Sequence, residues 1–140
     1  MRASRIEGKV EEMPVANDDL AHLRSAYDAI RSGNPDPLIQ LMDKNIRWIG
    51  DASLGDPPPE CANREQASAV LRRAVGRIPS REMESVAISG NRILAVAHWE
   101  EGQGPPGCDC VYNLLTLEDG RIVRMEDFFK RDAAERAFRA

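Results

Sequence analysis

Apolar residues in the first half of the chain recur every three to four positions, which is the spacing of one face of an α-helix. The longest such stretch covers residues 18–32; Asn17, Asp18 or Asp19 can cap its first turn, and Gly33 ends it. A short second helix is expected over residues 35–43, with prolines in its first turn, and a third over residues 64–77.

The period changes to two after residue 80. An earlier strand is expected at 45–51, and four alternating stretches separated by glycine-containing turns follow later: 81–89, 92–102, 108–118 and 121–130. Short connections join antiparallel neighbours, so helices followed by a strand meander favour an α+β domain with helices packed on one face of an antiparallel sheet. A twisted sheet of this kind curls round the long helix into a cone, whose open end is a natural small-molecule site.

The last alternating stretch carries a carboxylate on its more apolar face, which alternation assigns to Val123, Met125, Asp127 and Phe129. A buried, unpaired carboxylate is costly, so it normally has partners or a raised pKa. A raised pKa suits a general acid or base near neutral pH. Two other interpretations stay open: Asp127 points to solvent at the end of the strand, or it caps the helical tail that follows.

Composition narrows the classes of partner. The chain has 140 residues, enough for one domain, and a formal net charge of −4 without a long basic run argues against nucleic acid. The longest apolar stretch, residues 93–99, is shorter than the ~20 residues of a membrane helix. Residues 1–16 lack the apolar centre of a signal peptide, and we expect a flexible extension before a cytoplasmic domain over residues 17–140.

The three cysteines are expected to be free thiols in a reducing compartment. Cys108 and Cys110 are close in sequence, but no second Cys/His pair at ligand spacing accompanies them. No metal site is therefore expected.

Several local motifs resemble a known superfamily. They are AYDAIRSGNPDPLIQLM, DKNIRWIGD, PPPECANREQASAVL and LLTLEDGRIVRMEDFF, which together span roughly residues 18–138. On these motifs the chain is similar to the SnoaL-like branch of the nuclear-transport-factor-2-like superfamily, which implies a cystatin-like, cone-shaped α+β barrel. The resemblance also implies chemistry without a metal or nucleotide cofactor. Its members include steroid isomerases, polyketide cyclases, dehydratases, epoxide hydrolases and proteins with no chemistry.

The resemblance does not extend to the catalytic triad of the steroid isomerases. Aligning the motifs places Ala26, Gly50 and Asn113 at the triad positions. The polar residues Tyr27 and Asp51 lie one residue away, and one residue on a strand reverses the face. We therefore do not expect steroid isomerase activity.

The expected strand register gathers polar side chains on the inner wall of the cone. A three-residue loop at 118–120 pairs Val111 with Asp127, and the preceding loop places His98 beside Val111. Asp127 lies near the acidic residue that the resemblance implies for polyketide cyclases, and we expect Asp127 and His98 to be the catalytic pair. The expected ligand-binding residues are Asn113, Asp109, Trp48, Tyr27, Met125, Phe129, Val111 and Val96.

Two functions fit this wall. The first is a cofactor-independent isomerase, cyclase, dehydratase or hydrolase that moves protons on a small apolar or mixed-polarity molecule. The second is a non-catalytic ligand-binding or dimerisation module, in which His98 beside Trp99 is structural. A homodimer through the sheet is also expected, because the convex face would otherwise expose Tyr112, Leu114 and Phe128.

Overall fold

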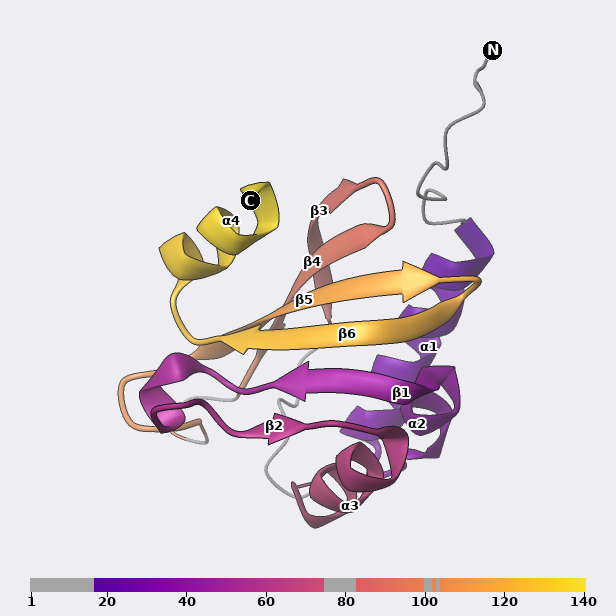
Figure 1. The fold of residues 1–140 in the computed structure, drawn as a ribbon, viewed down its shortest axis with the longest axis horizontal. Coiled ribbons are helices and arrows are strands. Elements are labelled where there is room, and N and C mark those ends of the chain that lie inside the picture. The colour runs from indigo at the N-terminus through magenta and orange to yellow at the C-terminus, as the bar shows by residue number, and fades with distance from the viewer. Residues whose placement is uncertain (1–16, 75–82, 100–101, 103) are drawn as a thin grey trace.

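The structure, a computed structural model, describes residues 17–74, 83–99, 102 and 104–140. They form one six-stranded sheet with helices on both faces (Figure 1). The elements are α1 (Asn17–Arg31), α2 (Asp36–Leu41), β1 (Met42–Ile49), the 3₁₀ turn η1 (Ala52–Leu54), β2 (Glu60–Cys61), α3 (Arg64–Ala74), β3 (Glu84–Ser89), β4 (Arg92–His98), β5 (Cys110–Glu118), β6 (Arg121–Phe128) and α4 (Arg131–Arg139). The expected α+β class is confirmed, while the extension expected over residues 1–16 lies outside the described residues. None of the helices in the described part of the chain has the length and apolar character of a membrane span.

The sheet has the strand order β2-β1-β6-β5-β4-β3. Strands β3 to β6 form the expected antiparallel meander. The expectation of a wholly antiparallel sheet is wrong at one place, because β1 lies parallel to β6. These two strands are far apart in sequence, so no tight hairpin turn sets their relative direction. The parallel pairing brings their C-terminal ends to the same end of the sheet.

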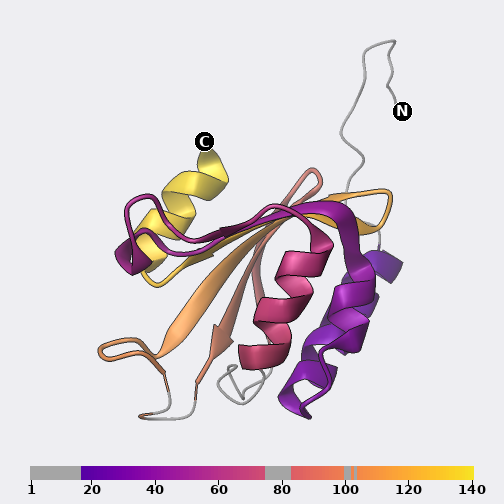
Figure 2. The same cartoon turned by 60° about the horizontal axis from the view of Figure 1, so that its bottom comes forward.

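Helices α1, α2 and α3 cover the inner face of the sheet, and α4 lies on the opposite, outer face (Figure 2). The apolar stripe of α1 buries Leu23, Ala26 and Ile30. They pack in one core with strand residues such as Ile46 and Leu115, both 0% exposed. Full burial of an aliphatic side chain of this size contributes about 1.5–3 kcal/mol, so this core holds the helices on the curved sheet.

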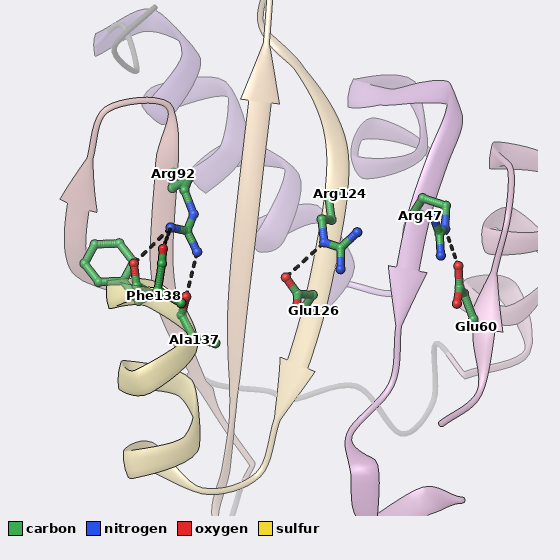
Figure 3. A network of polar contacts seen from close by, with 8 residues as sticks. Arg47, Glu60, Arg92, Arg124, Glu126, Ala137 and Phe138 are labelled. Carbon is green, nitrogen blue, oxygen red and sulfur yellow. Dashed lines mark hydrogen bonds and ion pairs between the residues drawn. The ribbon is translucent and has the colours of Figure 1, made fainter. Parts of the chain in front are cut away.

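Helix α4 covers part of the outer face. Leu94 and Leu114 are buried under it. Arg92 anchors the end of the helix, because its guanidinium donates to the carbonyl oxygens of Ala137 at 2.8 Å and Phe138 at 3.0 Å (Figure 3). The expectation that the outer face exposes Leu114 is therefore wrong: the chain's own C-terminal helix leaves that residue 1% exposed.

The rest of this face carries ion pairs. Arg124 Nε lies 3.1 Å from Glu126 Oε1, and Arg47 pairs with Glu60 on the next two strands (Figure 3). The surface beside α4 is thus charged rather than apolar, which removes much of the physical reason for expecting a dimer there.

The turn between β5 and β6 is shorter than expected. Asp119 and Gly120 have positive φ angles of 52° and 75°, as both central residues of a type I′ hairpin turn require. Glu118 pairs directly with Arg121 across the turn. The expected three-residue loop is therefore wrong, and the extra residue lies further along β6.

That extra residue is Val123, which forms a bulge because its neighbours on β6 pair with consecutive residues of β5. The bulge turns Ile122, which is 0% exposed, toward the core in place of Val123. Beyond the bulge, Asp127 lies opposite Asn113 rather than opposite Val111 as expected.

Candidate functional site

A cavity of about 220 Å³, called the first cavity below, lies between the inner face of the sheet and the helices that cover it. Its wall is mainly apolar and unusually rich in rings for a chain with 5% aromatic residues. The aromatic members are Tyr27, Trp48, Trp99 and Phe129. The polar members are Arg31, Asn113 and Asp127. Aliphatic members include Ile30, Leu38, Leu71, Ala97, Val111 and Met125.

A chain of hydrogen bonds converges on Asp127. The indole Nε1 of Trp48 donates to Asp127 Oδ2 at 2.9 Å, and Asn113 Nδ2 donates to Asp127 Oδ1 at 2.8 Å. The hydroxyl of Tyr27 donates to Asn113 Oδ1 at 2.9 Å. A carboxylate offers about four acceptor positions, so each Asp127 oxygen keeps a lone pair for a ligand or a water molecule.

The sheet register explains why these groups meet. Asn113 and Asp127 are directly opposed on β5 and β6, so their side chains project from the same face. Trp48 on β1 pairs with Met125, and Asp127 lies two residues beyond Met125 on the same face. Tyr27 reaches the wall from α1, one turn after the buried Leu23.

The electrostatics of Asp127 are set by its surroundings. Burial in the apolar wall is the largest effect and raises the pKa of Asp127 to about 6, while the hydrogen bonds from Trp48 and Asn113 oppose the rise. The nearby charge of Asp51 adds to it. A carboxyl group with a pKa near 6 exchanges its proton readily at neutral pH, which an ordinary aspartate does not.

Tyr27 is held in its neutral form. Burial, followed by the charge of Asp127, raises the pKa of Tyr27 well above its ordinary value. The phenol therefore remains a donor to Asn113 over the whole physiological pH range. This fixes the orientation of the Asn113 amide, whose nitrogen must then face Asp127.

Asp51 supports the site from outside the first cavity. Its Oδ1 accepts from the backbone N–H of Phe129 at 2.8 Å, and its Oδ2 accepts from the backbone N–H of Ser53 at 2.8 Å. Burial acts to raise the pKa of Asp51, but the hydrogen bonds from Ser53 and Phe129 outweigh it and the pKa is lowered. Asp51 thus stays ionised and fixes the backbone two residues beyond Asp127.

The segment after β4 supplies Trp99 to the wall. The Trp99 and Phe129 rings meet edge to face, with centroids 6.5 Å apart. A Cβ atom at Gly104 would lie 2.8 Å from the Trp99 ring and 2.6 Å from the carbonyl oxygen of Cys108. Glycine at this position therefore lets the indole lie against the loop before β5.

Most of the expected wall residues do line the first cavity. They are Asp127, Asn113, Tyr27, Trp48, Met125, Phe129 and Val111. The interpretations of Asp127 as a solvent-facing group or as the cap of the last helix are not supported: Lys130, not Asp127, is the N-cap residue of α4. Sequence reasoning missed Trp99, Arg31, Ile30, Leu38 and Leu71. The helical periodicity around Ile30 and Leu71 could have indicated an inward face, but not which part of it borders a cavity.

The placement of His98 on the inner wall is wrong. In the observed register Ala97 pairs with Val111 and His98 pairs with Cys110, so His98 projects from the outer face. Its Nε2 lies 3.3 Å from Glu84 Oε1, in a partly exposed pair. The error is a shift of one residue, which reverses every side chain of β4.

Because of the same one-residue shift, the predicted placement of Val96 on the cavity wall is also wrong. Val96 pairs with Tyr112 and faces away from the first cavity. Its neighbours Ala95 and Ala97 face the helices instead, and Ala97 lines the cavity. Asp109 is exposed in the loop before β5, where its carbonyl oxygen accepts from the backbone N–H of Trp99 at 2.9 Å. The aspartate side chain lies outside the cavity wall.

Comparisons with known proteins agree with this architecture. The SnoaL-like domain family matches residues 23–125, and the chain belongs to that family. No curated protein matches the chain.

Solved structures with the same fold include three that bear on the site. An NTF2-like protein of unknown function from Mesorhizobium loti is 19% identical, with a TM-score of 0.59 over 80% of this chain and 90% of that one. A putative SnoaL-like polyketide cyclase from Jannaschia is 19% identical, with a TM-score of 0.57 over 94% and 99%. A protein with a ketosteroid isomerase-like fold from Catenulispora acidiphila, solved in complex with trimethylamine, is 15% identical, with a TM-score of 0.53 over 85% and 90%. At these identities the likeness establishes the fold alone.

Proposed function

We propose that the first cavity is the active site of a cofactor-independent enzyme in which Asp127 moves a proton on a small, largely apolar substrate. The observation that carries the proposal is a carboxyl group held by Trp48 and Asn113 inside an apolar, ring-lined cavity. Burial raises the pKa of this group to about 6, which suits a general base that works near neutral pH.

The reaction begins with Asp127 mainly ionised at pH 7. Its free lone pairs take a proton from an acidic carbon of the substrate, or from a water molecule placed between substrate and carboxylate. Trp48 and Asn113 keep the carboxylate oriented during this step. The carboxyl group then returns the proton to a neighbouring atom, which is the common element of isomerisation, cyclisation, dehydration and hydrolysis.

The lining supports a small substrate. A cavity of about 150 Å³ holds benzene, so one of about 220 Å³ accepts a single ring with one or two substituents. The rings of Trp48, Trp99 and Phe129 favour an apolar or unsaturated body. The polar atom of the substrate would then lie beside Asp127.

A test without knowledge of the natural substrate uses two simple probes. Cyclohexanone in D₂O reports abstraction of a carbon-bound proton through deuterium uptake seen by NMR, and cyclohexene oxide reports activation of water through diol formation. We expect Asp127→Asn to lose ~10²–10⁴-fold in the rate that the native protein shows. His98→Asn should leave that rate unchanged, because His98 lies on the outer face. Equal rates for the native protein and Asp127→Asn would contradict the proposal.

A second candidate function is the binding of a small protonated amine without chemistry. Within the described residues, the charged group that acts on Asp127 is Asp51, which is also an acid. A bound ammonium ion would supply the missing positive charge, and the rings of Trp48 and Trp99 would attract its alkyl groups through cation–π contacts. The trimethylamine bound to the Catenulispora acidiphila protein supports this candidate.

Titration of the protein with trimethylamine separates the two candidates. Trp48 and Trp99 are the chain's two tryptophans, so their fluorescence reports directly on the first cavity. The binding function predicts saturable binding that weakens below pH 6 and in Asp127→Asn, with no turnover of either probe. Absence of binding to the native protein would reject it.

Dimerisation through the sheet and a cytoplasmic location remain predictions. If a dimer forms through the outer face, it must use the charged part beside α4, where Arg47, Glu60, Arg124 and Glu126 lie. Such a dimer should weaken at high ionic strength, which light scattering can measure.

A further inference from the structure

Arg31 is the one cation among the described residues that line the first cavity, and the proposed proton transfer does not use it. It is also the one exposed member of that wall, since the other lining residues are buried or half-buried. Within the described part of the chain, the cavity therefore opens to solvent beside Arg31. A ligand that enters there leaves its outermost atoms next to the guanidinium group.

Arg31 and Asp127 lie at different parts of the cavity. Arg31 follows Tyr27 by four residues, so it lies one turn further along the same face of α1, about 6 Å along the helix axis. Tyr27 is the residue of this helix that connects to Asp127, through Asn113. Within the described residues, the charge that acts on Asp127 belongs to Asp51 and not to Arg31. The site thus has an acid at one part of its wall and a separate cation at its opening.

The guanidinium group of Arg31 can bind a ligand without a large rearrangement. Its Nη2 lies 2.7 Å from Asp28 Oδ1 on the same helix, and among the described residues Asp28 is the partner of this side chain. Exposed pairs of this kind contribute little to stability. A guanidinium group carries five N–H donors in a planar fork that matches the two oxygens of a carboxylate. A ligand carboxylate can therefore bind Arg31 beside Asp28 or in its place.

We propose that Arg31 binds a carboxylate of the substrate at the opening of the first cavity, so that the substrate is a small aromatic or unsaturated carboxylic acid. Its apolar body lies among the rings of Trp48, Trp99 and Phe129. A carboxylate at the opening keeps part of its hydration, whereas the same group further inside would lose that hydration beside a second acid, Asp127. This inference rests on the proposed function, because it names the substrate class of the same site, but it is tested by binding alone.

Three probes of similar size and different charge test the inference. They are phenylacetate, phenylacetamide and 2-phenylethylamine, with binding followed by tryptophan fluorescence at pH 7. Apolar burial alone predicts that the neutral amide binds at least as tightly as the acid, because a charged group loses hydration on binding. The proposal predicts the reverse, with phenylacetate bound about tenfold more tightly than phenylacetamide, which corresponds to ~1.4 kcal/mol.

Three variants locate the effect at Arg31. Arg31→Gln removes the cation, so it should abolish the preference for phenylacetate and leave the binding of phenylacetamide unchanged. Arg31→Lys keeps a point charge without the planar fork, so it should retain part of the preference. Asp28→Asn removes the competing carboxylate and should strengthen phenylacetate binding by about twofold, the size expected for an exposed pair three residues apart on a helix.

Arg72→Gln is the matched control. Arg72 Nη2 lies 2.7 Å from Asp36 Oδ1 in another exposed ion pair, but Arg72 does not line the first cavity. The variant removes the same charge and should leave the binding of all three probes unchanged. Circular dichroism checks the fold of each variant. If Arg31→Gln does not fold, the opposite changes expected in Arg31→Lys and Asp28→Asn still decide the test.

The outcomes separate this inference from the proposed function. Equal binding of phenylacetate and phenylacetamide, a preference that survives in Arg31→Gln, or no binding of any probe would overturn the carboxylate site. Tightest binding of 2-phenylethylamine would also overturn it and would favour the amine-binding candidate. The role of Asp127 is tested separately, because cyclohexanone and cyclohexene oxide are neutral and do not need Arg31. Equal rates of the native protein and Asp127→Asn on those two probes would reject the proposed function alone.

Discussion

Asp127 connects stability to pH at the scale of single residues. Because its folded pKa of about 6 lies above its unfolded value near 3.9, the folded state binds this proton more tightly than the unfolded state. The contribution to stability is fully present below about pH 4 and is lost as pH rises through 6. Above pH 6 the partly buried charge lowers the free energy of unfolding by at most roughly 3 kcal/mol, at 1.36 kcal/mol per pKa unit.

The variant Asp127→Asn should therefore be more stable than the native protein at pH 8, and the difference should shrink toward zero near pH 4. The fold can accept the amide, because a flip of Asn113 lets its oxygen receive the new N–H while its nitrogen donates to the phenol oxygen of Tyr27, which then accepts instead of donating, and Trp48 keeps an acceptor. Urea unfolding at several pH values measures this. A difference in free energy of unfolding that is constant with pH would show that Asp127 does not titrate in this window.

Trp48 is predicted to hold the pKa of Asp127 down. Removal of its indole N–H in Trp48→Phe deletes one donor to the carboxylate, and a hydrogen bond to a charged group is worth ~1.5–3 kcal/mol. We expect the pKa of Asp127 to rise further, by about one unit or more, and any base-catalysed rate to shift to higher pH by the same amount. Tyr27→Phe is the matched control, since its hydroxyl contacts Asn113 and not Asp127. Equal shifts in both variants would contradict the direct role of Trp48.

At the scale of elements, the docking of α4 depends on Arg92. Its guanidinium joins the last carbonyl groups of the helix to β4, and its Cζ lies 5.8 Å from the centroid of the Phe138 ring. Arg92→Gln should lower the free energy of unfolding by ~1–3 kcal/mol. Arg124→Gln on the same face is the control and should cost less than ~1 kcal/mol, because its pair with Glu126 is partly exposed. Chemical denaturation of both variants tests this prediction. Equal losses in the free energy of unfolding would mean that Arg92 does not anchor the helix.

Element types could be predicted from periodicity, but strand registers could not. The 3.6-residue and two-residue periods located helices α1 to α3 and strands β3 to β6. The Asp119-Gly120 dipeptide indicated the hairpin, yet nothing in the alternation signals the bulge at Val123, three residues after Gly120. The β4–β5 connection contains three glycines and two prolines, so its length does not determine a register, and a shift of one residue moved His98 to the wrong face.

Site residues could be predicted where their direction follows from alternation along one strand, but contacts between residues of two strands could not. Asp127 and Met125 follow from alternation along β6 alone, and both line the first cavity. The hydrogen bond from Trp48 to Asp127 depends on the parallel pairing of β1 with β6, which no short turn signals. From the sequence, Asp51 was noted only because it lies one residue away from a catalytic position of the steroid isomerases. In the structure its carboxylate accepts a hydrogen bond from the backbone N–H of Phe129.

At the scale of the whole molecule, α4 protects the outer face from association. It covers Leu94 and Leu114, and Tyr112 and Phe128 pack beside them. Ala134→Glu, which places a charge at a fully buried contact of the helix, should detach α4 and expose this apolar patch. Light scattering should then show self-association that grows with concentration. A variant that keeps the native mass, with circular dichroism showing an intact fold, would contradict this protective role.

The central claim is that Asp127 is a partly buried carboxyl group that titrates near neutral pH inside a ligand cavity. The most direct test is an NMR titration of protein carrying ¹³C-labelled aspartate carboxyl groups, with Asp127→Asn used to assign the resonance. The structure predicts a midpoint near pH 6 for Asp127. A midpoint at or below 4, the range of an aspartate in open solvent, would contradict the claim.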